Sequence, residues 1–133
     1  MAEALLVVAA MLASWPGGTC PPDHFCAPTV GIYGRIENYY DPSGATDIGP
    51  GIVRVLGAPA IHLAGHAYTQ FWAAVMLRDG DVVYAYGTGY RISGKTVEYA
   101  CQPSQGERKA VALQTSLSTG PCGAVILVHA EAE

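Results

Sequence analysis

Short stretches of alternating apolar and polar residues, separated by turn residues, run along most of this chain. The stretch from Val30 to Tyr40 places Ile32, Gly34 and Ile36 on one face of a predicted strand. Further strands are expected at residues 52–56 and 60–64 around a turn at 57–59, and at 81–86, 89–92, 96–100, 111–116 and 124–130. The last of these, AVILVHA, is almost continuously apolar, which is typical of a central strand buried on both faces.

One segment has helical spacing instead. The stretch TQFWAAVML, from Thr69 to Leu77, carries Phe71, Val75 and Met76 at helical intervals, and the Thr69 side chain can cap its first turn. The helix should end at the turn signal Arg78-Asp79-Gly80-Asp81. About eight strands and one short helix predict a mainly β fold, a small closed barrel.

The chain divides into two parts by composition. Residues 1–29 are an apolar N-terminal segment followed by a Cys-, Pro- and Gly-rich connector, and residues 30–133 form the barrel domain. A length of 133 residues leaves room for a single core, and sixteen glycines with nine prolines favour short strands joined by tight turns.

The apolar run from Ala4 to Ala13 has two interpretations. It is too short to span a bilayer, which needs roughly 20 such residues. It is similar to the apolar region of a signal peptide, but Glu3 stands where a positive charge belongs. The run is either a cleaved leader or a retained strand or helix. If it is retained, it suits donation of a strand to a neighbouring copy, which is a route to self-assembly.

Charge and cysteine content limit the partners and the setting. The formal net charge is −4, and the seven Lys and Arg residues are scattered, which argues against nucleic acid. The four cysteines show neither a C-x-x-C pair nor zinc spacing, so two disulfides, Cys20–Cys26 and Cys101–Cys122, are the simplest pairing. Three connectivities are possible, and four reduced, buried thiols are the alternative. Disulfides would indicate an oxidising setting: extracellular, at a cell surface or on a virus particle.

A set of short motifs follows in a fixed order over residues 60–130. Ala64-Gly65-His66 ends an apolar strand, a helix with Phe71 follows, and Leu77 precedes the pair Gly80-Asp81. Leu113-Gln114-Thr115-Ser116 then closes a later strand. In this order and spacing the segment resembles the sortases, the cysteine transpeptidases of Gram-positive cell surfaces. Their typical run is A-G-H, F-x-x-L, L-x-x-G-D, T-L-x-T-C and a last strand opened by Arg.

The resemblance implies an eight-stranded sortase-like barrel with its site at the strand ends that carry His66 and Ser116. In that family a Cys thiolate attacks a peptide carbonyl to form a thioester, a His acts as its partner and acid, and an Arg holds the oxyanion. This chain has Ser116 at the nucleophile position, and Pro121, Cys122 and Gly123 stand where the Arg belongs. A serine hydroxyl is barely ionised and needs a placed general base. Of the matched catalytic positions, only His66 is kept.

Cys122 offers a different nucleophile. If Ser116 and the last strand form a hairpin, Cys122 or Gly123 would lie near the vacated position, and Cys122 could act toward His66. Arg91 or Arg108 could then stabilise the oxyanion. A Cys101–Cys122 disulfide excludes this arrangement.

Two functions follow. The favoured one is a non-catalytic sortase-like module that binds a polypeptide or serves as a structural component, because the thiol and the Arg are lost together. The alternative is a divergent cysteine transpeptidase acting on surface polypeptides.

No cofactor or metal site is predicted. A His62/His66 pair lacks a third ligand, and the oxygen-rich loop Asp41–Asp47 is first a turn signal, although its oxygens could hold calcium. His24 and His129 are expected to be surface or packing residues. Five tyrosines could line a peptide groove, but half-buried strand positions are the simpler interpretation; they are Tyr39, Tyr40, Tyr84, Tyr86 and Tyr90.

Overall fold

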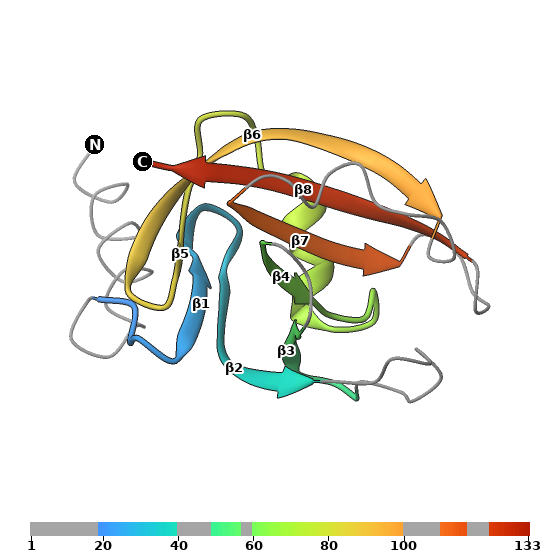
Figure 1. The fold of residues 1–133 in the computed structure, drawn as a ribbon, viewed down its shortest axis with the longest axis horizontal. Helices are drawn as coiled ribbons and strands as arrows, with labels where there is room; N and C mark the ends of the chain where they lie inside the picture. The colour runs from blue at the N-terminus through green and yellow to red at the C-terminus, as the bar shows by residue number, and fades with distance from the viewer. Residues whose placement is uncertain (1–18, 40–48, 57–59, 100–109, 117–122) are drawn as a thin grey trace, which may run out of the picture.

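Eight strands close into one barrel in the order β1-β2-β3-β4-β7-β8-β6-β5 (Figure 1). The computed structural model describes residues 19–39, 49–56, 60–99, 110–116 and 123–133. The strands are β1 (His24–Ala27), β2 (Ile32–Tyr39), β3 (Ile52–Val55), β4 (Ile61–Ala64), β5 (Val82–Ala85), β6 (Thr88–Tyr99), β7 (Val111–Ser116) and β8 (Ala124–Ala132). Two 3₁₀ helices accompany them, η2 (Pro28–Val30) and η3 (Gln70–Met76). The predicted mainly β, closed barrel is confirmed.

Strand β1 lies inside the segment that the sequence predicted to be a connector. It pairs with β2 through Phe25 and Gly34, and with β5 through Phe25 and Ala85, so it closes the barrel. Phe25 and Ala27 are fully buried. These four residues, which the sequence predicted to be part of the Cys-, Pro- and Gly-rich connector, therefore form a strand of the barrel. A strand this short, placed between prolines, has too little alternation to be detected.

Strand β6 replaces two predicted strands. The sequence suggested a break near Ser93-Gly94, but β6 runs unbroken along β8 with a register shift between Ile92 and Gly94. A β-bulge of this kind inserts one residue and bends the strand without ending it. The turn-like pair therefore marks a bulge.

Helix η3 buries a different face from the one predicted. Thr69 caps it as expected, since its Oγ1 accepts a hydrogen bond from the Phe71 N–H at 3.2 Å. Its buried residues are Phe71 and Ala74, followed by Leu77 just beyond its end. This spacing of three is the period of a 3₁₀ helix. Met76, predicted to share the apolar face, is 67% exposed instead.

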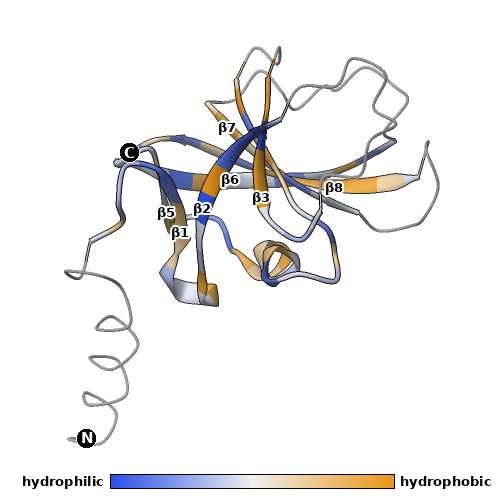
Figure 2. Ribbon diagram, turned by 90° about the horizontal axis from the view of Figure 1, so that it is seen from below, coloured by the Kyte–Doolittle hydropathy of each residue, from blue (hydrophilic) through white to orange (hydrophobic). Residues whose placement is uncertain are grey.

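The core lies inside the barrel, and η3 contributes to it. The strands carry both apolar and polar stretches, as the hydropathy colouring shows (Figure 2), and their buried apolar residues form the core. Phe71 of η3 packs edge-on against Phe25 of β1 with ring centroids 5.6 Å apart. The Gln70 side chain anchors the same helix to β2, because its amide accepts from the Tyr33 N–H at 3.2 Å and donates to the Tyr33 carbonyl at 3.0 Å. Helix η3 is thus fixed from both its core side and its β2 side.

Strand β8 occupies the central place that its composition predicted. It pairs with β7 on one side and with β6 on the other. Residues 127–130 are buried on both faces of the sheet. Within the described ranges, no helix combines the length and apolar character needed to cross a membrane.

Candidate functional site

The strand ends that carry His66 and Ser116 lie next to each other. β4 and β7 are parallel neighbours, paired from Ile61 and Val111 up to Ala64 and Gln114. The Gly65 N–H extends the ladder by donating to the Gln114 carbonyl at 3.1 Å. His66 and Ser116 each follow two residues after the last pair. Both residues therefore emerge at the same end of adjacent strands.

The turn after β4 fixes the position of His66. The His66 carbonyl accepts hydrogen bonds from the Thr69 N–H at 3.0 Å and from the Thr69 hydroxyl at 2.7 Å. The half-buried imidazole stacks on the exposed ring of Tyr68, with centroids 4.9 Å apart and planes 15° from parallel. Tyr68 was not among the site residues predicted from the sequence. An aromatic residue two positions after the histidine, in a turn, was the available signal.

Ser116 is the last residue of β7 and is half-buried. It pairs with Val125 of β8, so the predicted hairpin between this strand and the last one is present. The preceding Thr115 is 2% exposed, and its hydroxyl has no hydrogen-bond partner among the described residues. Ser116 thus occupies the predicted nucleophile position, and its hydroxyl lies at the end of β7.

Arg91 lies too far from Ser116 to stabilise an oxyanion there. It pairs with Val82 and Glu131, whereas the residue of β6 level with Ser116 is Glu98, through Val125. Glu98 lies seven positions after Arg91 along the strand, which is roughly 23 Å. The Arg91 guanidinium instead donates to the Gly80 carbonyl at 3.2 Å. The suggestion that Arg91 replaces the missing arginine is therefore wrong.

Several other predicted site residues fall outside the described part of the chain. They are Cys101, Cys122, Arg108 and the loop 41–47. Cys122 as a nucleophile, the Cys101–Cys122 disulfide and a calcium ion in the loop remain predictions.

The remaining histidines have side-chain partners within the described residues. His62 is buried, and its Nε2 lies 2.6 Å from the Gln114 Oε1. His129 is buried, with its Nε2 2.8 Å from the Thr96 hydroxyl. Among the described residues, no three His, Cys, Asp or Glu side chains come together as a metal site.

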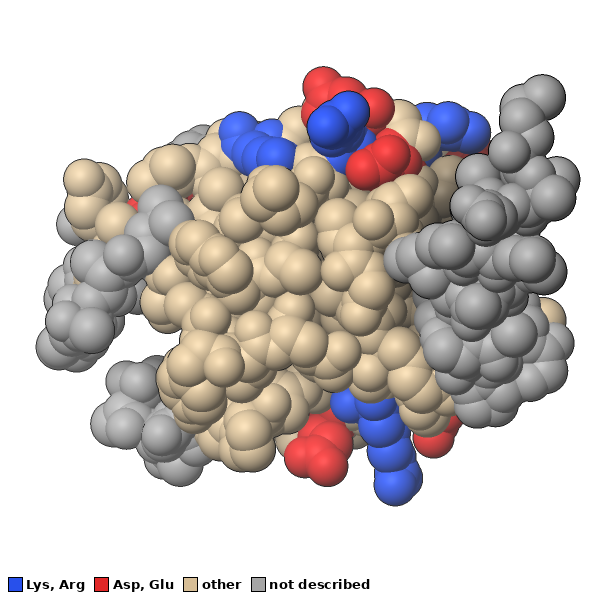
Figure 3. All heavy atoms as spheres, turned by 180° about the vertical axis from the view of Figure 1, so that it is seen from behind, with Lys and Arg blue, Asp and Glu red and all other residues tan. Residues whose placement is uncertain are grey.

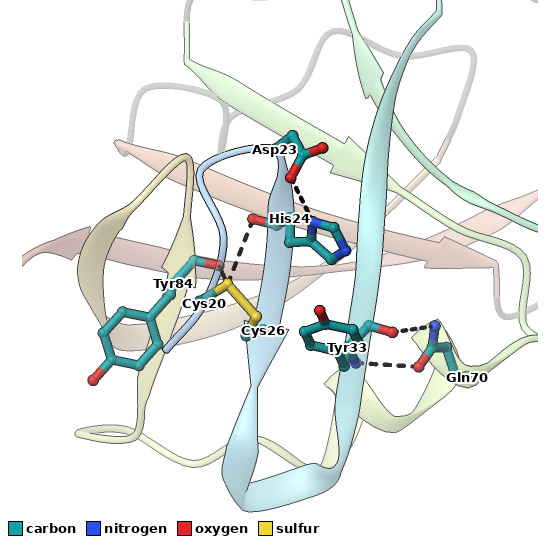
Figure 4. The surroundings of a disulfide bond; sticks show 7 residues. All are labelled: Cys20, Asp23, His24, Cys26, Tyr33, Gln70 and Tyr84. Atoms are coloured by element: carbon teal, nitrogen blue, oxygen red, sulfur yellow. Dashed lines mark hydrogen bonds and ion pairs between the residues drawn. A yellow bond between two sulfur atoms is a disulfide. The ribbon is translucent and has the colours of Figure 1, made fainter. Parts of the chain in front are cut away.

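The predicted Cys20–Cys26 disulfide is present (Figure 4). It joins the chain before β1 to a completely buried position within that strand. The Cys20 sulfur lies 3.7 Å from the His24 carbonyl and 4.0 Å from the Tyr84 carbonyl of β5. Beside it, the hydrogen bond from His24 holds the pKa of Asp23 below its ordinary value. The bridge therefore pins the start of the described chain to the barrel wall.

Comparison with known proteins identifies the fold. No family model matches the sequence, and no curated protein matches it. Among solved structures, sortase A of Listeria monocytogenes is similar with a TM-score of 0.63 at 12% identity, over 86% of this chain and 88% of that one. A sortase C of Clostridium perfringens with the C-terminal cell wall sorting motif gives 0.63 at 21% identity, over 83% and 69%. Sortase A of Corynebacterium diphtheriae gives 0.60 at 18% identity, over 83% and 59%. The chain has a sortase-type barrel.

Proposed function

We propose that this protein is a sortase-fold binding module that holds an extended polypeptide beside His66 without forming an acyl intermediate on Ser116. The observation that carries the proposal is the pairing of β4 with β7, which brings His66 and Ser116 to one end of the barrel. This is the place where the sortase resemblance expects a histidine and a thiolate. Here the second group is a serine, and no arginine begins β8.

The chemistry of the two groups favours binding over catalysis. A serine needs a general base and a stabilised oxyanion to attack a peptide carbonyl. The His66 ring is a candidate base, but Arg91, the described candidate for the second role, lies about 23 Å along β6. The exposed Tyr68 ring beside His66 adds an apolar surface on which a peptide side chain can pack.

The proposed ligand is a polypeptide displayed at a cell surface. Two of the similar structures are Clostridium perfringens sortase C complexes with a C-terminal cell wall sorting motif, and we extend that ligand class to this chain. The Cys20–Cys26 disulfide fits an oxidising, extracytoplasmic setting. No observation favours the virus particle over the cell surface.

Titration of the isotope-labelled protein with a sorting-motif peptide tests the proposal. We expect saturable amide shifts at residues 65–68 and 114–116, with the peptide recovered intact by mass spectrometry. A scrambled peptide of the same composition is the control. The Ser116→Ala variant should bind as well as the wild type, because the hydroxyl forms no bond to the ligand. Shifts confined to other surfaces, or none at millimolar peptide, would overturn the proposal.

The same samples distinguish the transpeptidase alternative. A cleaved peptide, or a protein mass increased by an acyl fragment, would show that catalysis survives. Proteolytic mapping of the adduct would assign it to Ser116 or Cys122, and a Cys122→Ala variant would lose it only in the second case.

A further inference from the structure

Arg54 faces the inside of the barrel. It lies two residues after Ile52 on β3, and Ile52 belongs to the core, so the two side chains share the inner face of the strand. Arg54 is half-buried, and its guanidinium lies over the ring of Tyr86, 5.1 Å from the ring centroid. Within the described part of the chain, the ion pairs formed by other residues leave this guanidinium without a carboxylate.

Tyr86 reaches Arg54 from a turn that does not suit a tyrosine. Ala85 and Thr88 pair across β5 and β6, so Tyr86 and Gly87 form the two-residue turn between these strands. Both have positive φ angles, 53° and 79°, and Tyr86 is the one non-glycine residue with positive φ in the described ranges. Such turns normally have asparagine or glycine at this place, because a bulky side chain is strained there. The contact of the ring with Arg54, and not the turn, therefore accounts for the tyrosine.

The contact crosses one end of the barrel. In the closed strand order β1 and β2 lie between β5 and β3, so the Tyr86 ring reaches Arg54 over the interior and not along the sheet. The ring packs against the core, and its hydroxyl is buried with no hydrogen-bond partner among the described residues. The β5–β6 turn comes just before Thr88, whereas Ser116 is level with Glu98 at the other end of β6. The contact is therefore at the opposite end of the barrel from the candidate site.

The stack leaves the hydrogen-bond donors of Arg54 available. A guanidinium that stacks on an aromatic ring uses its face, while its five N–H donors lie in its plane. Because donors without acceptors are unfavourable in a group partly withdrawn from water, a half-buried arginine normally meets a carboxylate or a phosphate. Asn38 lies directly opposite Arg54 in the β2–β3 pairing and is exposed, so this part of the inner face is open to solvent. Its amide group is a further donor.

We propose that Arg54, stacked on Tyr86, is a binding site for a single carboxylate group. A carboxylate matches the planar donor fork of a guanidinium and accepts two N–H bonds from it. A polyanion would need several clustered cations, but on the face seen from behind the Lys and Arg side chains stand at two margins, most of them beside acidic ones (Figure 3). The carboxylate belongs either to a small organic acid or to a polypeptide. The proposal is independent of peptide binding at His66.

Carboxylate titrations of the isotope-labelled full chain test the proposal. The probes are succinate, a small organic acid, and N-acetylglycine, which has the carboxylate of a peptide C-terminus. We expect saturable shifts of the Arg54 Nε–H and Asn38 side-chain amide signals, with a dissociation constant of about 1–10 mM for the better probe. The tighter of the two probes assigns the source of the carboxylate. N-acetylglycinamide, which lacks the carboxylate, and sodium chloride at equal ionic strength should cause no saturable shift.

Three variants and a control identify the binding group. Arg54→Gln should lose saturable binding, and Arg54→Lys should weaken it roughly tenfold or more, because an ammonium cannot form the planar two-bond pair. Tyr86→Asn suits the turn but removes the stacked ring, so it should weaken binding roughly threefold or more. Arg78→Gln is the matched control, since it removes an exposed arginine elsewhere, and it should bind like the wild type.

The wild type alone can overturn the proposal, whatever the variants do. It fails if neither probe causes a saturable shift at Arg54 at concentrations of about 100 mM. It also fails if the shifts persist in Arg54→Gln, or if Arg78→Gln weakens binding as much as Arg54→Gln does. Unchanged binding in a folded Tyr86→Asn variant would show that the ring supports the turn and not the site.

Discussion

The side chain of Phe71 lies against the backbone of Gly65, one residue before His66. A Cβ placed on Gly65 would come within 2.5 Å of the Phe71 Cβ and 2.7 Å of its Cγ. Phe71 is fully buried and packs on Phe25, so the ring has no space into which it can retreat. Packing therefore requires the glycine in the Ala64-Gly65-His66 motif, whatever chemistry the imidazole performs.

Substitution of Gly65 by alanine should destabilise the barrel. We expect the Gly65→Ala variant to lose about 1–3 kcal/mol of unfolding free energy, because the added methyl group overpacks the contact with Phe71. Urea denaturation measures the loss. Gly51→Ala is the matched control, since the nearest atom to its added Cβ, the Glu37 Oε2, is 4.0 Å away. Equal losses in the two variants would contradict the packing argument.

Removal of the Thr69 hydroxyl should loosen the turn that carries His66. The hydroxyl caps η3 through the Phe71 N–H and donates to the His66 carbonyl. We expect Thr69→Ala to cost about 1 kcal/mol, and Thr69→Ser to cost less because it keeps the cap. Thermal denaturation gives the stabilities, and the amide signals of residues 66–69 report the turn. If serine and alanine were equally harmful, the hydroxyl would not be the stabilising group.

Most of the fold could be predicted from short-range patterns. The β2 face that carries Ile32 and Ile36, the Thr69 cap and the central place of β8 all follow from periodicity over a few residues. The prediction failed where tertiary pairing overrides a local signal. β1 is too short to show alternation. Ser93-Gly94 resembles a turn, but β6 pairs with β8 on both sides of the bulge and so continues as one strand.

The candidate site was only partly predictable. The motif order was sufficient to select His66 and Ser116, and the parallel pairing of β4 and β7 now places both at one strand end. Sequence spacing contains no information on where a residue lies along a neighbouring strand, so it could not show that Arg91, one of the two suggested arginines, lies about 23 Å from the level of Ser116. The stack of Tyr68 on His66 was missed because it depends on the turn geometry set by Thr69.

Loss of the Cys20–Cys26 bridge should lower stability modestly. The two cysteines are six residues apart, so the loop that the bridge closes is short, and the chain-entropy contribution is about 2 kcal/mol. We expect the double variant Cys20→Ser/Cys26→Ala to melt roughly 5–10 °C below the wild type under oxidising conditions. An unchanged melting temperature would show that the bridge does not stabilise the barrel.

Reductant added to the same double variant tests the second predicted bridge. With Cys20 and Cys26 removed, only Cys101 and Cys122 remain in the chain. If they are joined, reductant should lower the melting temperature further, and thiol alkylation should label them only after reduction. Alkylation of both thiols without reductant would contradict the predicted pairing and leave Cys122 available as a nucleophile.

The Asp23 carboxyl should make stability depend on pH at acid pH. Its hydrogen bond with His24, 2.6 Å long, lowers the pKa of Asp23 below the ordinary 3.8, and Arg35 at 3.5 Å acts in the same direction. The pKa of this carboxyl is lower in the folded protein than in the unfolded chain. The ionised carboxyl therefore stabilises the folded protein at pH values above its unfolded-state pKa, and this stabilisation is lost as the pH falls through its folded-state pKa.

We therefore expect Asp23→Asn to be less stable than the wild type at about pH 5, with a gap that closes as the pH falls well below 3.8. Urea denaturation of both proteins across this range measures the gap. Glu37→Gln is a useful control, because it removes another exposed carboxylate, on β2. A gap for Asp23→Asn that stayed constant down to about pH 2 would show that the side chain stabilises β1 by something other than its charge.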